Sequence, residues 1–190
     1  MKIKIPSQLA LDYITAHLTY NPDTGLLYKD NKQIGYQRKQ DNRIVVQLII
    51  GKTTEGHNIH YTCYLPQVAW YLTYGAWSTT YIDHIDGDRT NNRLSNLRLT
   101  TPSQNSYNVK KGKKITSSRF KGVNWDQGKW RAYITMSGKR HHIGRYPTEE
   151  EAAVAYDTKA VEVFGVYAKL NFGENAAVSG EMQQLTLPCG

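Results

Sequence analysis

Residues 82–105 read IDHIDGDRTNNRLSNLRLTTPSQN, and this stretch predicts how the middle of the chain folds. The β-like run at 79–83 predicts a strand that leads into a polar loop, and the residues at 96–99 predict the returning strand. The Thr-Pro-Ser-Gln sequence at 101–104 predicts the start of a helix, because Thr is a good cap, Pro suits the first helical position and Gln completes a capping box. The predicted order is therefore strand, polar loop, strand and helix.

Three residues of this stretch suggest a chemical site. Asp83 and His84 stand where the first strand enters the loop, and Asn105 lies in the first turns of the helix. One carboxylate and one amide oxygen would make a hard, partly open site of the kind that binds Mg²⁺ or Mn²⁺. A histidine beside such a metal can remove a proton from a water molecule that attacks phosphorus. The residues therefore predict phosphodiester hydrolysis, with Asp83 and Asn105 as metal ligands and His84 as general base.

A polar surface loop is the alternative interpretation, because Asn and Asp also favour turns. We assign Asp86, Asp88, Asn91 and Asn92 to the turn on this ground. The order Asp-His-Ile-Asp-Gly-Asp departs from an EF-hand loop, so a calcium site of that type is excluded. From local chemistry alone, one Asp-His pair does not decide between a loop and a site.

The pattern of residues 82–105 as a whole resembles the HNH homing-type endonucleases of phages and group I introns. The resemblance implies a ββα-metal finger in which His84 is the general base and Asp83 and Asn105 are the metal ligands. It also implies that Asn96, the middle Asn of the motif, holds the loop through hydrogen bonds. Many members of the family have His at the position of Asn105, so the resemblance implies an H-N-N variant, which disfavours tight binding of softer metals such as zinc.

The positive charge of the chain is concentrated in one segment. Residues 101–145 contain 11 Lys and Arg and one acid, a net charge of +10, whereas the whole chain carries +8. A basic block with interspersed aromatic side chains is typical of nucleic-acid-binding proteins. The alternative is a basic face that only keeps the protein in solution. Residues 110–117 form a basic linker, and we expect four of its lysines to contact DNA: Lys110, Lys111, Lys113 and Lys114.

Three strand-like runs and one helix follow the linker, at 119–125, 129–136, 139–146 and 149–165. Along the middle run, alternate residues from Trp130 are apolar and those from Arg131 are polar. The helix carries a stripe of small side chains, which predicts that it lies against the apolar face of a three-stranded sheet. We assign Trp125 and Trp130 to the core rather than to base stacking, because stacking needs exposed aromatic rings.

This basic segment resembles the DNA-binding domain of plant ethylene-response factors, through its Ile-Gly-Arg-Tyr, Glu-Glu-Ala-Ala-Val-Ala-Tyr-Asp and Ala-Lys-Leu-Asn-Phe runs. Members of that family lay the sheet in the major groove, where Arg reads guanine and Lys meets phosphate. The resemblance implies the following DNA-facing residues: Lys121, Asn124, Arg131, Tyr133, Thr135, Arg140, His142 and Arg145. A zinc site at His141 and His142 is not expected, since adjacent residues on a strand diverge.

The fold class predicted for the chain is α+β. The first 65 residues predict a small scaffold without chemistry of its own, with a helix near 9–18 and apolar strands at 43–50 and 57–64. The C-terminal segment predicts a three-stranded antiparallel sheet on one helix. The expected domains are a scaffold at 1–65, a nuclease core at 66–109, a basic linker at 110–117, a DNA-binding domain at 118–172 and a tail at 173–190.

The leading functional prediction is a metal-dependent, site-directed, homing-type endonuclease that nicks double-stranded DNA. A non-catalytic, sequence-specific DNA-binding regulator is the alternative, and RNA binding is disfavoured because the sheet lacks exposed aromatic pairs. No apolar run approaches the ~20 residues of a membrane span. Two distant cysteines predict neither a disulfide scaffold nor a structural zinc site. We therefore expect a cytoplasmic protein that does not associate with membranes. We also expect a monomer, because the sequence predicts one finger and no evident dimer surface.

Overall fold

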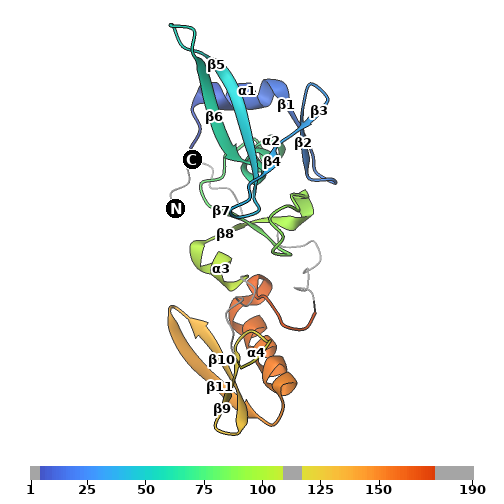
Figure 1. Ribbon diagram of the computed structural model, residues 1–190, viewed down its shortest axis with the longest axis vertical. Coiled ribbons are helices and arrows are strands. Elements are labelled where there is room, and N and C mark those ends of the chain that lie inside the picture. The colour runs from blue at the N-terminus through green and yellow to red at the C-terminus, as the bar shows by residue number, and fades with distance from the viewer. Residues whose placement is uncertain (1–4, 109–116, 174–190) are drawn as a thin grey trace. The chain divides into compact units, whose positions relative to one another are not determined.

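The computed structural model describes residues 5–108 and 117–173 of the chain. The chain divides into two compact units, Met1–Pro102 and Ser103–Gly190 (Figure 1). Each unit combines small antiparallel sheets with helices, so the predicted α+β class is confirmed. In the described ranges, none of the helices has the length and apolar character of a membrane span.

The first unit opens with a helix and a small sheet. The helix α1 is capped by Ser7, whose side chain accepts a hydrogen bond from the Ala10 N–H. The three strands of the sheet are antiparallel and follow one another in chain order. The elements are α1 (Gln8–His17), β1 (Leu18–Asn21), β2 (Leu26–Lys29) and β3 (Lys32–Ile34).

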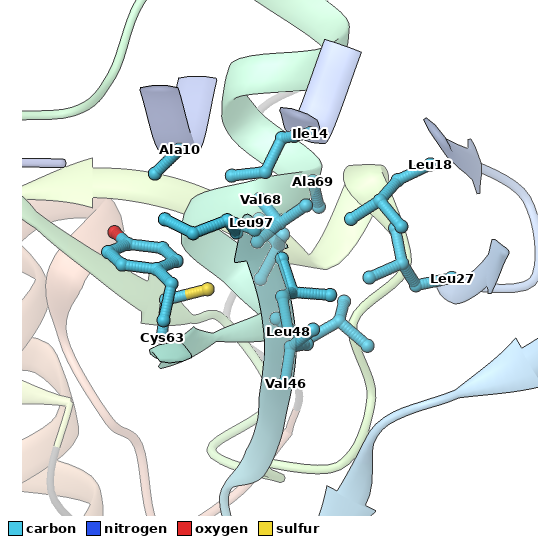
Figure 2. Packing of buried hydrophobic residues seen from close by; sticks show 13 residues of the cluster. Ala10, Ile14, Leu18, Leu27, Val46, Leu48, Cys63, Val68, Ala69 and Leu97 are labelled. Atoms are coloured by element: carbon cyan, nitrogen blue, oxygen red, sulfur yellow. The ribbon is translucent and has the colours of Figure 1, made fainter. Parts of the chain in front are cut away.

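A β-hairpin and a second helix form the core of the first unit. Val46, Leu48 and Ile50 alternate along one strand and are buried, as the apolar run at 43–50 predicts. Helices α1 and α2 contribute side chains to the same core, which also contains Leu97 (Figure 2). The elements are β4 (Tyr36–Gln37), β5 (Ile44–Lys52), β6 (Asn58–Tyr64) and α2 (Leu65–Tyr74).

The central stretch folds in the predicted order of strand, loop, strand and helix. Two short antiparallel strands flank the polar loop, which ends in one turn of 3-10 helix. Residues from both sides of the expected boundary at residue 65 contribute to one hydrophobic core, and the division into a scaffold at 1–65 and a nuclease core at 66–109 stays a prediction. The elements are β7 (Tyr81–His84), η1 (Leu94–Asn96), β8 (Leu97–Thr100) and α3 (Pro102–Tyr107).

The second unit contains a three-stranded antiparallel sheet packed on one helix, as predicted. Its strands lie in the order β11, β10, β9, and α4 is capped by Thr148, which accepts from the Glu151 N–H. The small side chains of α4 at Ala152, Ala153 and Ala160 are fully buried. The elements are β9 (Val123–Asp126), β10 (Lys129–Met136), β11 (Lys139–Tyr146), α4 (Glu149–Phe164) and η2 (Gly165–Tyr167).

Candidate functional site

The end of strand β7 places Asp83 and His84 on opposite faces. Both residues are buried, with 9% and 8% of their surface exposed. Asp83 lies opposite Arg98 in the antiparallel register, and residues paired in this way share one face of a sheet. The Asp83 side chain therefore contacts Arg98, whereas the His84 side chain contacts the loop between β7 and β8.

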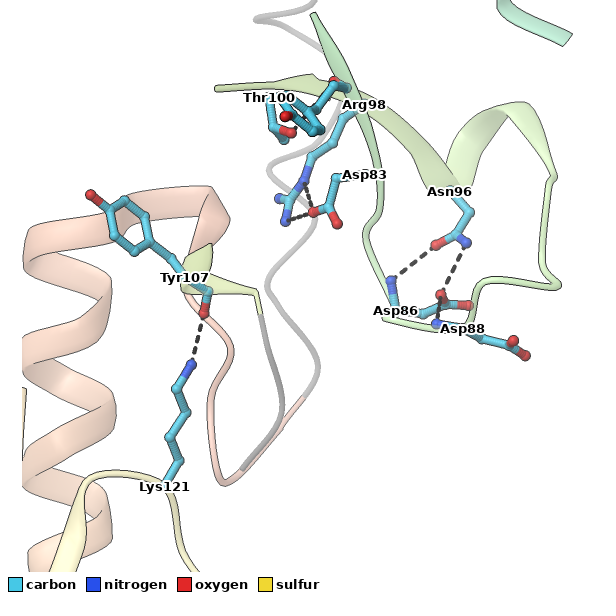
Figure 3. Close-up of polar contacts among 9 residues, drawn as sticks. Asp83, Asp86, Asp88, Asn96, Arg98, Thr100, Tyr107 and Lys121 are labelled. Carbon is cyan, nitrogen blue, oxygen red and sulfur yellow. Dashed lines mark hydrogen bonds and ion pairs between the residues drawn. The ribbon is translucent and has the colours of Figure 1, made fainter. Parts of the chain in front are cut away.

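A buried ion pair joins Asp83 to Arg98 (Figure 3). Oδ2 of Asp83 accepts two hydrogen bonds from the guanidinium, at 3.2 Å from Nε and 3.0 Å from Nη2. Only 13% of the Arg98 side chain and 10% of the Asp83 side chain is exposed, so salt screens this pair little. Arg98 has no predicted role in the site, because only the pairing register of the two strands places it opposite Asp83.

The imidazole of His84 is held by Asn92, a residue that the sequence analysis assigned to the turn. His84 Nε2 and Asn92 Oδ1 are 3.0 Å apart, and Asn92 is 2% exposed. Asn92 Nδ2 donates to the Thr90 carbonyl at 3.1 Å, so the amide turns its oxygen toward the imidazole. An oxygen acceptor requires a hydrogen on Nε2, and a neutral ring then carries its lone pair on Nδ1. The contact with Asn92 thus selects one tautomer of His84.

Asn96 joins the two ends of the polar loop. Its Oδ1 accepts from the Asp86 N–H at 3.0 Å, and its Nδ2 donates to Asp86 Oδ1 at 3.0 Å (Figure 3). The same Nδ2 also donates to the Asn91 carbonyl at 2.8 Å. Burial acts to raise the pKa of Asp86, but hydrogen bonds from Asn91, the Asp88 N–H and Asn96 outweigh it, and the pKa lies below its ordinary value. Asn96 therefore makes the kind of contacts that a loop-holding residue needs.

The Asp83 carboxylate fits a hard divalent cation by its chemistry, because carboxylate oxygens are preferred ligands of Mg²⁺ and Mn²⁺. Its Oδ2 is engaged by Arg98, so a cation would share this carboxylate with the guanidinium or displace it. Asn105 lies in α3 and belongs to the second unit, and its role as a second ligand stays a prediction. Within residues 5–108 and 117–173, no three His, Cys, Asp or Glu side chains gather as metal ligands.

In the second unit, one face of the sheet carries seven of the eight predicted DNA-facing residues. The opposite face buries Ala132 and Ile134, which have 0% and 1% of their surface exposed. The pairing registers match Asn124 and Arg145 with Arg131, His142 with Tyr133, and Arg140 with Thr135. Paired residues share a face, so the face comprises Asn124, Arg131, Tyr133, Thr135, Arg140, His142 and Arg145.

A β-bulge at Ile143 makes this arrangement possible. The partner of strand β10 changes from Gly144 to His142 between Ala132 and Tyr133, which leaves Ile143 as the extra residue. On a regular strand, His142 and Arg145 would point to opposite faces, because side chains alternate. The bulge shifts the alternation by one residue, so both side chains join the polar face while Ile143 packs on the core.

An acidic residue lies among the arginines of this face. Asp126 Oδ2 accepts from Nη2 of Arg145 at 2.6 Å and from Nη1 of Arg131 at 3.4 Å. The Arg140 guanidinium lies over the ring of Tyr133, at 4.3 Å from its centroid. These contacts restrict the rotamers of three long cationic side chains.

Lys121 does not join the polar face. Its Nζ donates to the Tyr107 carbonyl at 2.7 Å, at the last residue of α3 (Figure 3). Burial, with the nearby charge of Lys169, lowers the pKa of Lys121 to about 8. The ring of Tyr107 stacks on Phe164, with centroids 4.0 Å apart, so α3 packs on α4. The predicted linker contacts at Lys110, Lys111, Lys113 and Lys114 lie outside the described residues.

Of the two tryptophans that were predicted to lie in the core, one packs on it and the other is exposed. Trp130 is partly buried and packs on the core beside Ala132. Trp125 is 48% exposed, and its ring meets the Trp130 ring edge-on at 5.0 Å. The assignment of Trp125 to the core was wrong because β9 is an edge strand of the sheet, which leaves one side of this residue open.

Comparison with known proteins identifies the family. The family model described as HNH endonuclease matches residues 63–107. The chain is 45% identical over 95 residues to an uncharacterized HNH endonuclease of Acanthamoeba polyphaga mimivirus, covering 50% of this chain and 48% of that protein. It is 41% identical over 91 residues to protein 3.8 of Escherichia phage T7, covering 47% of this chain and 74% of that protein. The chain belongs to the HNH endonuclease family.

Two further similarities accompany the HNH match. The solved structure of the HNH homing endonuclease I-HmuI covers 78% of this chain and 85% of its own, with 19% identity and a TM-score of 0.39. The chain is also 36% identical over 76 residues to the AP2-like ethylene-responsive transcription factor TOE2 of Arabidopsis thaliana, covering 39% of this chain and 16% of that protein. The chain spans about half the length of its mimivirus relative.

The HNH match contains all four residues predicted for the cleavage site: Asp83, His84, Asn96 and Asn105. Strands β7 and β8 with their loop bring the first three into the same small sheet and loop. The structure adds two residues to these: Arg98 contacts Asp83, and Asn92 contacts His84.

Proposed function

We propose that this HNH endonuclease hydrolyses phosphodiester bonds of double-stranded DNA, with His84 as the general base. The observation that supports this most is the buried His84 ring, whose Nε2 lies 3.0 Å from the Asn92 amide oxygen. With its hydrogen on Nε2, the ring can accept a proton at Nδ1 from the water that attacks phosphorus. The proposed product is a nick with 5′-phosphate and 3′-hydroxyl ends, made by a monomer in a site-directed, homing-type reaction.

A divalent cation, Mg²⁺ or Mn²⁺, is proposed to bind at Asp83 and Asn105. When bound, the metal would stabilise negative charge on the scissile phosphate and on the leaving 3′ oxygen. The Arg98 guanidinium lies 3.0 Å from Asp83 Oδ2, so a bound cation would share this carboxylate with Arg98 or displace it. We call the segment between β7 and β8, residues 85–96, the catalytic loop. Asn96 keeps the two ends of this loop together.

The second unit is proposed to bind the DNA duplex as an ethylene-response-factor-type domain. The support is that seven polar residues of the sheet share one face, opposite the face that packs on α4. Arg131, Arg140 and Arg145 can read guanine in the major groove, since a guanidinium bonds the O6 and N7 atoms together. Lys121 is left out of this set, because its ammonium group is bonded to the Tyr107 carbonyl. The contacts of the linker lysines stay a prediction.

The test is plasmid nicking in Mg²⁺, Mn²⁺ or EDTA by the full chain and by His84→Ala. General-base loss should slow nicking by about 10²- to 10⁴-fold and leave DNA affinity unchanged, because His84 is not placed in the DNA-binding face. His57→Ala is the matched control, since the His57 side chain is 77% exposed and contacts the exposed Glu55 carboxylate. Undiminished nicking by His84→Ala would refute the role of His84. A wild-type chain that binds DNA but never nicks it would favour the DNA-binding regulator.

A further inference from the structure

The turn between strands β1 and β2 packs against the backbone of the catalytic loop. The Leu94 N–H donates to the Pro22 carbonyl at 2.9 Å, and Arg93 Nε donates to the Asp23 carbonyl at 2.9 Å. The Tyr20 hydroxyl donates to the Asn92 carbonyl at 2.6 Å. Three consecutive residues of the loop are therefore bonded to strand β1 and the turn that follows it, about 70 residues earlier in the sequence.

Gly25 allows this turn to approach the loop closely. Its φ is +74°, and a Cβ atom built on it would lie 2.4 Å from the Arg93 nitrogen and 2.5 Å from the Asn92 carbonyl carbon. Backbone atoms cannot yield as a flexible side chain can, so any other residue would push the loop away from the turn. The Asn21 side chain fixes the turn by accepting from two of its N–H groups at 3.0 Å.

The residue held by this turn is the one that contacts His84. Asn92 is bonded through its backbone carbonyl to Tyr20 and through its side-chain oxygen to His84 Nε2. Its Nδ2 is bonded as well, to the Thr90 carbonyl. Burial raises the pKa of Tyr20 to about 12, so its hydroxyl keeps its proton at neutral pH and remains a donor. One hydrogen bond thus holds the backbone of Asn92, and two hold its side-chain amide.

We propose that Asn92 is a positioning residue for His84, and that the β1–β2 turn is the support that keeps Asn92 in place. The turn places the backbone of Asn92, and the Asn92 oxygen then selects the tautomer and the ring orientation of His84. Only the expected effect on the nicking rate rests on the proposed role of His84 as base. It gives the N-terminal segment, which the sequence analysis left without chemistry, a part in the catalytic site.

The first readout is the tautomer of His84 in the intact chain, measured by ¹⁵N NMR of the imidazole in mildly alkaline buffer, where imidazoles are neutral. In the wild type, Nε2 should carry the hydrogen and Nδ1 the lone pair. Asn92→Ala should give a mixture of both tautomers. A wild type with its hydrogen on Nδ1, or an unchanged ring in Asn92→Ala, would overturn the proposal. This readout does not depend on nuclease activity.

The second readout is the kinetics of nicking with a matched pair of glycine variants. Gly25→Ala and Gly56→Ala place the same strain on the backbone, at φ of +74° and +84°, but nothing lies within 4 Å of a Cβ built on Gly56. We expect kcat to fall by about 10- to 100-fold in Asn92→Ala and Gly25→Ala with KM little changed, since small misplacement of a catalytic group costs this much. Gly56→Ala should keep the wild-type kcat.

Tyr20→Phe covers the case in which Gly25→Ala fails to fold. It removes the hydroxyl that donates to the Asn92 carbonyl from strand β1, and kcat should fall several-fold. Tyr28→Phe on the neighbouring strand β2 is the control and should keep the wild-type kcat. Wild-type kcat and an unchanged His84 tautomer in Tyr20→Phe and Gly25→Ala would overturn the role of the turn. Absence of nicking by the wild type would contradict the proposed function, and the NMR readout would still decide the contact of Asn92 with His84.

Discussion

Replacing Arg98 by Met should destabilise the first unit strongly, because it leaves the Asp83 carboxylate buried without its cation. Both side chains are nearly buried, at 13% and 10% exposed, and the partners are 3.0 Å apart. Removing one partner of a buried pair costs about 3–5 kcal/mol. The hydrogen bonds from the guanidinium to Asp83 Oδ2, at 3.2 Å and 3.0 Å, are longer than is usual between charged groups, so we expect the lower limit of about 3 kcal/mol.

Urea unfolding of the full chain, followed by the amide NMR signals of β7 and β8, measures this loss. With a slope of about 1–3 kcal/mol per molar urea, a loss of about 3 kcal/mol lowers the midpoint by about 1–3 M. Arg89→Met is the matched control, because Arg89 is exposed and donates to a backbone carbonyl, that of Asp41, at 3.2 Å. That variant should change stability by less than about 0.5 kcal/mol.

The double variant Asp83→Asn with Arg98→Met separates charge from packing. If the cost comes from the uncompensated carboxylate, the double variant should be more stable than Arg98→Met alone, because the amide carries no charge. A loss below about 1 kcal/mol in Arg98→Met, the range of exposed ion pairs, would refute the assignment of a buried pair. So would a double variant that is less stable than either single variant.

Three other predictions concern metal choice and the second unit. Asn105→His should extend nicking to borderline metals such as Ni²⁺ and Co²⁺, because imidazole suits them better than an amide oxygen does; nicking in Mg²⁺ alone would contradict the ligand role. Asp126→Ala should tighten binding to non-specific DNA and steepen its salt dependence, measured by fluorescence anisotropy, because two arginines lose their carboxylate partner; an unchanged slope would count against the proposed face. Burial lowers the pKa of Lys121 to about 8, whereas the unfolded chain has the ordinary value near 10.5. Between these two pH values the unfolded chain binds more protons than the folded one, so wild-type stability should rise with pH relative to Lys121→Met. A stability difference between the two proteins that does not change with pH would exclude the shift.

Much of the fold was predictable from local patterns. The Thr-Pro start of α3 and the cap at Thr148 predicted where two helices begin, because a cap is a contact between residues three positions apart. The alternation from Trp130 predicted which face of β10 is buried. Such signals depend on neighbours in the chain, and tertiary structure seldom overrides them.

The roles within the site were harder to predict. Asn92 was assigned to the turn, as Asn91 was, because both have the composition of a turn and no local feature distinguishes them. Only the folded loop shows that Asn92 is 2% exposed and bonded to His84. The core that α2 shares with the β5–β6 hairpin is a similar case, since neither segment alone predicts that the two pack together.

Sequence patterns alone predicted the order of elements, the basic character of the second unit and the position of Asp83 and His84 at a strand end. These follow from composition and from spacing along the chain. Tertiary structure decided three matters: that Arg98 faces Asp83, that the β1–β2 turn supports Asn92, and that a bulge at Ile143 brings His142 to the same face as Arg145. Each depends on which backbone segments pair and in what register, and a shift of one residue in register changes the face of every side chain that follows.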